Sequence, residues 1–246
     1  MKYFKRLKNK KEFRELYEKQ AKEYDFKRSN NFEGKIVDLL QRKFILSEIK
    51  KYCLSENKKL DKISILEAGC GTGRILSYFA KNNFSCYGFD TSKNMLNILK
   101  NKAKKENFKI ITKMGDIEKI PFPNNSFDIV YTMHVLMHMP DHKKAIEEMY
   151  RVLKNKGILI ADFPNKNSIW TKLSLLLEPK RKRTRLFTKR ELSLFFKQYN
   201  YTFDGLFSYA RTFYKIPILK YFVIFFEKNI KLPIFWRTQF LIVVKK

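Results

Sequence analysis

The stretch of sequence that decides the fold is ISILEAGCGTGR, at residues 63–74. An apolar run typical of a buried β-strand ends in three alternate glycines, and a helical pattern follows at 75–81. Gly69, Gly71 and Gly73 permit positive φ angles and carry no Cβ, so a ligand can lie against the backbone where the strand ends and the helix begins. This arrangement predicts a site for a nucleotide-like cofactor.

The spacing of these glycines excludes two other nucleotide-binding motifs. A dinucleotide-binding fingerprint needs a third glycine three residues after the second, whereas residue 74 is an arginine. A phosphate-binding loop of the form Gly-x-x-x-x-Gly-Lys-Ser/Thr occurs nowhere in the chain. An ordinary turn from strand to helix is the alternative interpretation of the glycines taken alone.

Further predicted strands follow, and carboxylates recur at their ends. We expect strands at 84–89, 109–114, 127–132, 157–163, 201–209 and 240–244, and helices at 92–105 and 189–198. Asp90 lies about 17 to 20 residues beyond the glycines, where the next strand of a doubly wound sheet should end and where a carboxylate can accept both ribose hydroxyls. Asp116 follows the third strand. Either residue could instead serve as a turn residue or a helix cap.

Five sequence blocks occur in an order and at a spacing typical of one enzyme family. They are LEAGCGTG at 66–73, GFDTS at 88–92 with ML at 95–96, GDI at 115–117, FDIV at 127–130 and YRVLKNKG at 150–157. Together they resemble the class I S-adenosylmethionine-dependent methyltransferases, of the broad group that includes the ubiquinone and menaquinone C-methyltransferases. The resemblance implies an α/β fold with a Rossmann-like, seven-stranded, mostly parallel sheet, helices on both faces and an antiparallel last strand. It does not fix a substrate.

The resemblance also implies which residues hold S-adenosylmethionine. Glu67 and the first two glycines would lie near its methionine part, Asp90 would hold the ribose, and Asp116 would face the adenine edge. Met95 would pack on adenine, although an apolar residue in a helix is a core residue by default. The complete predicted set is Glu67, Gly69, Cys70, Gly71, Gly73, Asp90, Thr91, Met95, Asp116, Ile117, Met133 and Tyr24; for Tyr24, ordinary packing of a docking helix is the alternative.

The chain contains three histidines, and two of them are candidate catalytic bases. A histidine has the ordinary pKa best suited to take a proton from an acceptor. His134 directly follows the fourth strand, and a short helix would place His134 and His138 on one face near the transferred methyl group. Packing beside the cofactor is the alternative role for both. We expect His142, at a helix start, to be exposed.

The rest of the chain divides into a helical cap and two insertions. Residues 1–60 are expected to form an N-terminal cap with helices at 17–24 and 32–53. Residues 61–246 would form the methyltransferase domain. Insertions at 166–187 and 211–236, after strands 5 and 6, would build the acceptor pocket, because open α/β sheets bind ligands at the carboxyl ends of their strands.

The formal net charge of +28 is concentrated in the final third. Residues 166–246 carry 18 basic and 4 acidic side chains, above all in KRKRTR at 180–185. Such a cluster fits a solvated loop, a contact to RNA phosphates, or a contact to anionic lipid headgroups or a phosphorylated substrate. Neighbouring apolar segments suit an apolar acceptor. One of them, 216–226, is shorter than the roughly 20 residues of a bilayer span.

These patterns predict a methyltransferase that acts on a small-molecule or lipid-linked acceptor. The alternatives are a tRNA-type RNA methyltransferase, whose basic final third would bind phosphates, and a non-catalytic binding protein that keeps the fold. Neither nucleobase signature is present: YTMH at 131–134 replaces an Asn/Asp-Pro-Pro-Tyr run, and the fourth and fifth strands lack a nucleophilic cysteine. RNA is therefore the second choice.

Cysteine use and the first residues predict the compartment. Cys53, Cys70 and Cys86 lack the spacing of metal ligands, so we expect buried free thiols and no metal site. Residues 1–11 are basic without an apolar stretch, unlike a secretory signal. We therefore expect a basic cytoplasmic protein without a transmembrane segment, with peripheral contact to an anionic membrane as a variant.

Overall fold

The structure is a computed structural model that describes residues 10–29, 32–139, 141–177, 185–206 and 233–246. Most of the predicted basic cluster at 180–185 and most of the predicted insertion at 211–236 lie outside the described residues.

The described residues form one seven-stranded sheet with the order β3-β2-β1-β4-β5-β7-β6. Strands β1 to β5 are parallel, and β7 is antiparallel to both of its neighbours, β5 and β6. The strands are β1 Ser64–Ala68, β2 Ser85–Asp90, β3 Ile111–Met114, β4 Phe127–Thr132, β5 Leu153–Pro164, β6 Asn200–Leu206 and β7 Gln239–Lys245. The predicted sheet, with its antiparallel last strand, is confirmed.

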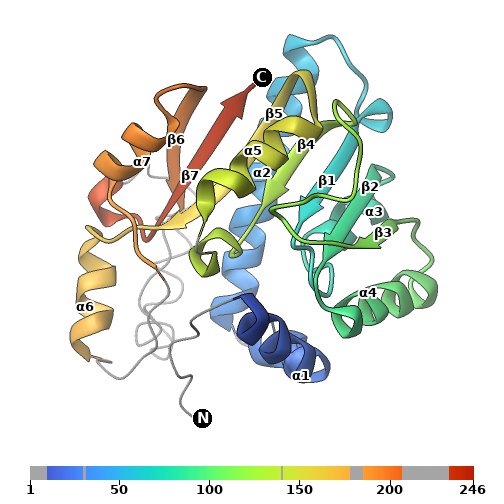
Figure 1. The fold of residues 1–246 in the computed structure, drawn as a ribbon, viewed down its shortest axis with the longest axis horizontal. Coiled ribbons are helices and arrows are strands. Elements are labelled where there is room, and N and C mark those ends of the chain that lie inside the picture. Colours follow the sequence, from blue (N-terminus) through green and yellow to red (C-terminus); the bar gives the residue numbers. More distant parts are fainter. Residues whose placement is uncertain (1–9, 30–31, 140, 178–184, 207–232) are drawn as a thin grey trace.

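Helices cover both faces of this sheet (Figure 1). Neighbouring residues of a strand point to opposite faces, so Ile65 packs in one core and Leu66 in the other. The helices are α1 Lys10–Ser29, α2 Phe32–Ser55, α3 Leu76–Lys81, α4 Lys93–Lys105, α5 His142–Val152, α6 Ile169–Leu177 and α7 Lys189–Phe196, with short 3₁₀ turns η1 Leu60–Lys62, η2 Leu136–His138 and η3 Ile234–Trp236. None of these helices combines the length and the apolar character needed to cross a membrane.

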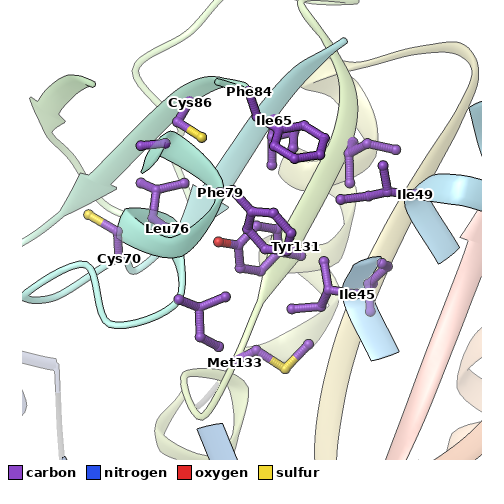
Figure 2. Packing of buried hydrophobic residues seen from close by; sticks show 14 of the residues in the cluster. Ile45, Ile49, Ile65, Cys70, Leu76, Phe79, Phe84, Cys86, Tyr131 and Met133 are labelled. Atoms are coloured by element: carbon purple, nitrogen blue, oxygen red, sulfur yellow. The ribbon is translucent and has the colours of Figure 1, made fainter. Parts of the chain in front are cut away.

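The core that contains Ile65 also attaches the N-terminal cap. Ile45 and Ile49 of α2 are buried, and Figure 2 shows them on the side of the cluster near Tyr131, with Phe79 of α3 beyond. The three cysteines, Cys53, Cys70 and Cys86, are free and buried, as predicted. Helix α2 is therefore part of the folded domain and not a separate appendage.

Two elements differ most from the sequence-based expectation in where they begin. Helix α1 begins at Lys10, whereas the pattern predicted a helix over 17–24 only, because charged residues interrupt its apolar stripe. Strand β5 begins at Leu153 and not at Gly157. Its polar start, LKNKG, has no strand-like alternation, and its pairing with β4 is irregular between Phe127 and Ile129.

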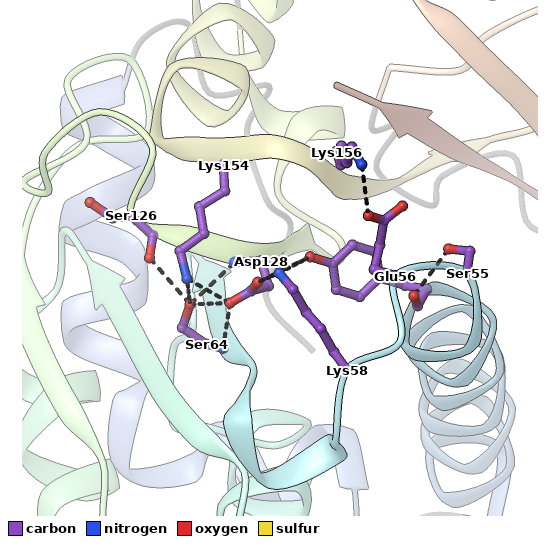
Figure 3. Close-up of polar contacts among 9 residues, drawn as sticks. Ser55, Glu56, Lys58, Ser64, Ser126, Asp128, Lys154 and Lys156 are labelled. Carbon is purple, nitrogen blue, oxygen red and sulfur yellow. Dashed lines mark hydrogen bonds and ion pairs between the residues drawn. The ribbon is translucent and has the colours of Figure 1, made fainter.

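At the amino end of the sheet, a buried carboxylate joins three strands and the cap (Figure 3). The Asp128 side chain is 2% exposed. Its Oδ1 accepts hydrogen bonds from Lys58 Nζ at 2.6 Å and the Tyr52 hydroxyl at 3.0 Å, and its Oδ2 accepts from Ser64 N at 3.0 Å and Lys154 Nζ at 2.8 Å. Burial alone would raise the pKa of Asp128, but the hydrogen bonds from Lys154 and Lys58 outweigh it and hold the pKa well below its ordinary value. The cluster lies opposite the predicted cofactor site, so its role is stability.

We predict that Asp128→Ala lowers the free energy of unfolding by about 2–3 kcal/mol, because it removes hydrogen bonds from charged partners. Since the pKa of Asp128 is depressed in the folded chain, its contribution is present above about pH 4 and is lost as the pH falls towards the folded-state pKa. Urea denaturation at pH 7 and at decreasing pH measures both effects. The exposed Asp61 gives the matched control, Asp61→Ala; equal losses in the two variants would contradict the prediction.

Candidate functional site

A cavity of about 560 Å³ lies at the carboxyl ends of β1, β2, β3 and β4, with α1 forming another wall. Figure 1 shows α1 beside this edge of the sheet. The predicted residues that line it are Gly69, Gly71, Asp90, Thr91, Met95, Asp116, Ile117, Met133, Tyr24, His134 and His138. Residues from five separate segments are thus brought to one space.

The three glycines after β1 are required for three different reasons. All have positive φ, with values of 74°, 51° and 72°. A Cβ on Gly69 would lie 2.6 Å from Val135 Cγ2, and one on Gly73 would lie 2.2 Å from Leu99 Cδ1. Around Gly71 a Cβ would meet nothing within 4 Å. Gly71 therefore opens onto the ligand space, whereas Gly73 does not line the cavity and instead permits the approach of α4.

Asp90, at the end of β2, is fixed by the glycine turn. Its Oδ2 accepts a hydrogen bond from Gly71 N at 2.8 Å, and its Oδ1 accepts one from Ser92 N at 2.9 Å. Burial raises the pKa of Asp90 against the opposing effect of these N–H groups. Each carboxylate oxygen keeps a second lone pair, so the group can also accept hydrogen bonds from ligand hydroxyls.

A smaller cavity of about 40 Å³ shares Gly69, Gly71 and Tyr24 with the larger one, and Glu67 and Cys70 line it. Oε2 of Glu67 accepts hydrogen bonds from the Tyr131 hydroxyl and Leu76 N, both at 3.1 Å. Burial raises the pKa of Glu67 to about 8, although Arg74 opposes the shift. A ligand cation placed here would stabilise the carboxylate.

At the end of β3, Asp116 lies in the cavity wall and is also a turn residue, as its second interpretation predicted. It lines the cavity, and its Oδ1 also accepts a hydrogen bond from Glu118 N at 2.9 Å, as a turn residue does. Ile117 and Met95 likewise line the cavity while being buried in the protein core. Packing and ligand contact are therefore not exclusive at these positions.

The two cavity histidines are held differently, and no single helix presents them. His134 has a φ of 61° and precedes η2, which contains only 136–138, so the predicted common helix face is wrong. Asp162 Oδ1 accepts the backbone N–H of His134 at 2.7 Å, and its Oδ2 lies 3.4 Å from His134 Nδ1.

The second ring nitrogen of His134, Nε2, also has a partner within the protein. Nε2 of His134 lies 2.8 Å from Gln41 Nε2. Arg74 Nη2 donates to Gln41 Oε1 at 2.9 Å, which fixes the amide so that its nitrogen donates to His134. His134 Nε2 is thus an acceptor already satisfied by the protein.

His138 has a different environment on the other side of the turn. Its Nε2 lies 3.3 Å from the Tyr17 hydroxyl, and its ring centroid lies 5.0 Å from that of Phe13. Both partners belong to α1 and line the cavity. Of the two candidates, His138 has the ring contacts that belong to the cavity wall itself.

His142 is buried and not exposed as expected. Its residue is 7% exposed, its ring lies 5.1 Å from the ring of Phe187, and Arg185 Nη1 lies 3.4 Å from its Nδ1. Burial lowers the pKa of His142. The sequence showed the helix start correctly, with Asp141 as the N-cap, but not the segment at 185–187 that packs over it.

Polar contacts fasten α1 over the cavity. Asp25 accepts hydrogen bonds from the Thr72 hydroxyl and from Lys102 Nζ, the latter at 3.0 Å. Glu18 accepts hydrogen bonds from the Ser92 hydroxyl and from Asn94 N at the start of α4. The inner face of α1 also brings residues that the motifs did not reveal into the cavity wall: Lys11, Phe13, Arg14 and Tyr17. A recurrence at 14, 17, 21 and 24 could have indicated this face.

Comparisons with known proteins agree with this geometry. Residues 66–161 match the family described as a methyltransferase domain. An uncharacterized protein of Methanocaldococcus jannaschii is 34% identical over 159 residues, which cover 65% of this chain and 64% of that protein. Demethylmenaquinone methyltransferase of Staphylococcus aureus is 33% identical over 156 residues, or 62% of this chain and 60% of that enzyme.

A solved structure shows the same fold over nearly the whole chain. Magnesium protoporphyrin IX methyltransferase from Synechocystis, with bound S-adenosylhomocysteine, has a TM-score of 0.66 at 14% identity and covers 97% of this chain and 100% of that one. At this identity the likeness concerns the fold alone. The chain spans between 37% and 64% of the lengths of the curated relatives it matches, with 51% for another M. jannaschii protein and 64% for the one above.

We predict that Gly73→Ala and Gly71→Ala separate stability from binding. Gly73→Ala should lower the free energy of unfolding by about 2–4 kcal/mol, since it combines a positive φ with overpacking against Leu99. Gly71→Ala should lower it by only about 1–2 kcal/mol. It should, however, weaken S-adenosylhomocysteine binding roughly tenfold, or about 1.4 kcal/mol. Urea denaturation and titration calorimetry measure the two quantities, and the opposite ranking in stability would refute the assignment.

Proposed function

We propose that this chain is a class I methyltransferase that transfers a methyl group from S-adenosylmethionine to a small-molecule or lipid-linked acceptor. Residues 66–161, which match the family described as a methyltransferase domain, support the proposal. The observation that carries the proposal is the single cavity in which the motif residues and a second, largely aromatic wall face the same space. The motif residues suit a nucleoside, and the wall from α1 and η2 suits an apolar acceptor beside it.

The residues of the site fit the cofactor. Asp90 has lone pairs for two ribose hydroxyls, and Gly71 leaves the backbone open beside it. Glu67 provides a buried carboxylate where the positive charge of a methionine ammonium or a sulfonium would be favourable. Asp116 and Ile117 would face the adenine, with Met95 packing on its ring. Thr91, Met133 and Tyr24 complete the proposed set.

When bound, S-adenosylmethionine supplies a methyl group on a positively charged sulfur, so the acceptor atom bonds to that carbon as the carbon–sulfur bond breaks, its electron pair stays on sulfur, and the acceptor gives up a proton. The protein mainly has to align the acceptor with the methyl group. Helix α1 and the turn at 134–139 form the walls that do so and exclude water.

We further propose that His138 takes the acceptor proton. Its ring lies in the cavity wall next to the Tyr17 hydroxyl, whereas Nε2 of His134 already accepts a hydrogen bond from Gln41. His134, with Asp162, instead holds the turn after β4 in position. This assigns different roles to the two histidines that the sequence offered together.

The first test is methyl transfer from labelled S-adenosylmethionine into an extract of the source cells, with and without ribonuclease. We expect label that survives ribonuclease and enters a methanol extract. Asp90→Ala should abolish the transfer, because it removes the carboxylate that binds the ribose of the cofactor in this proposal. Ribonuclease-sensitive label would show an RNA methyltransferase instead, and S-adenosylmethionine binding without any transfer would favour a non-catalytic protein.

A second prediction separates the histidines. His138→Asn should lower kcat by roughly 10²- to 10⁴-fold, the usual contribution of a general base, with little change in KM. His134→Asn should mainly lower the melting temperature, because it breaks the contacts to Asp162 and Gln41. Steady-state kinetics and thermal denaturation of both variants measure this. A His138→Asn enzyme with unchanged kcat would exclude the proposed base.

A further inference from the structure

The inner face of α1 carries two cations that belong to none of the cofactor-binding motifs. Lys11 and Arg14 line the cavity together with Phe13 and Tyr17. From this arrangement we propose that the methyl acceptor carries a negatively charged group, bound by Lys11 and Arg14, and a flat unsaturated part that lies against Phe13 and Tyr17. The inference rests on the proposed methyltransferase function and specifies its substrate class.

The two cations lie at the far end of the cavity from the glycine turn. Asp25, near the end of α1, is fastened to Thr72 of that turn. With a rise of 1.5 Å per residue, Arg14 and Lys11 lie about 16 and 21 Å from Asp25 along the helix axis. The two cations therefore lie at the end of α1 away from the glycine turn, beyond Glu18, which contacts Ser92 two residues after Asp90.

In the described part of the chain, some charged side chains of α1 bind partners within the protein, and others do not. Two of its five carboxylates, Asp25 and Glu18, bind Thr72, Lys102 and the start of α4, and so face partners within the protein. Among the described residues, Lys11 and Arg14 have no ion-pair partner, and both are exposed at the cavity. The carboxylates that line the cavity, Asp90 and Asp116, lie at the ends of β2 and β3. An anionic ligand group would thus find its counter-charge only at the α1 end of the described lining.

The wall next to these cations is aromatic. The His138 ring lies 5.0 Å from Phe13 and 6.1 Å from Tyr17, centroid to centroid. Rings at such distances favour a flat partner through offset or edge contacts. A guanidinium and an ammonium recognise carboxylate or phosphate oxygens through charge-assisted hydrogen bonds. The anionic group would bind to the two cations and stay charged in the product, because a different atom of the acceptor would receive the methyl group.

The test uses the full chain and a methanol extract of the source cells, freed of protein and RNA, with labelled S-adenosylmethionine. The products are passed over an anion-exchange resin in methanol, before and after phosphatase treatment. The variant is Lys11→Gln/Arg14→Gln. The control is Lys19→Gln/Lys22→Gln, which makes the same change of charge on exposed residues of α1 that do not line the cavity.

We expect the label to be retained by the resin. At limiting extract, Lys11→Gln/Arg14→Gln should transfer methyl groups roughly tenfold or more slowly, because charge-assisted hydrogen bonds are lost. Its S-adenosylhomocysteine affinity by calorimetry should stay within about twofold of wild type, since the proposed contacts of the cofactor with Gly71, Asp90 and Glu67 are left unchanged. The control pair should transfer at the wild-type rate. Retention that phosphatase abolishes identifies a phosphate monoester, and retention that persists identifies a carboxylate or another phosphatase-resistant anion.

Label that passes the resin unretained, or a Lys11→Gln/Arg14→Gln variant as fast as wild type, would overturn the assignment. An equal slowing of the control pair would do the same, since it would reduce the effect to net charge. Failure of the proposed function is distinguishable: a wild-type chain that binds no S-adenosylhomocysteine and labels nothing in any fraction overturns both. A wild-type chain that binds it and labels only uncharged compounds or RNA overturns the acceptor class alone.

Discussion

The hydrogen bond from Gly71 N to Asp90 Oδ2, at 2.8 Å, is the contact on which the site depends. It joins the turn after β1 to the end of β2, so two neighbouring parallel strands finish at a fixed distance with their backbone and carboxylate facing one space. It forms only because Gly71 has a positive φ, which few residues adopt without strain. Burial disfavours the charged form of Asp90, and backbone N–H groups, including that of Gly71, partly offset this effect by donating hydrogen bonds to the carboxylate.

The second constraint is the attachment of α1, whose described side chains take no part in the two core clusters, whereas α2 joins one of them. Helix α2 buries Ile45 and Ile49 in the domain core, whereas α1 is fastened to the cofactor turn and to α4 through Asp25 and Glu18, with Phe26 left 71% exposed. An element fastened by part-exposed polar contacts opens more readily than one that shares the core. The two helices of the N-terminal cap therefore do different work: α2 completes the domain, and α1 closes the site.

The amino end of the sheet carries a stabilising cluster, and the carboxyl end carries the candidate site. At the amino end, the Asp128 carboxylate accepts hydrogen bonds from Lys58, Lys154, Tyr52 and Ser64 and joins elements of the fold. At the carboxyl end, Asp90, Asp116 and Glu67 keep lone pairs that face open space. Because parallel strands all end at the same edge, every turn after a strand can contribute to one cavity, which is why ligands of such sheets collect there.

The sequence by itself determined most of the strands and the residues at their ends, because these depend on local patterns, and the resemblance implied the mostly parallel sheet. Buried strands read as apolar runs, positive-φ turns read as glycine, and Asp90 and Asp116 stand where the runs stop. It did not reveal the extent of α1 or β5, whose charged and polar residues mask the apolar periodicity. Only the tertiary structure decided that His142 is buried, that Gln41 occupies His134, and that Lys11 and Arg14 face the cavity. Those facts depend on contacts between segments up to about a hundred residues apart, and no local pattern encodes which distant side chain a residue will meet.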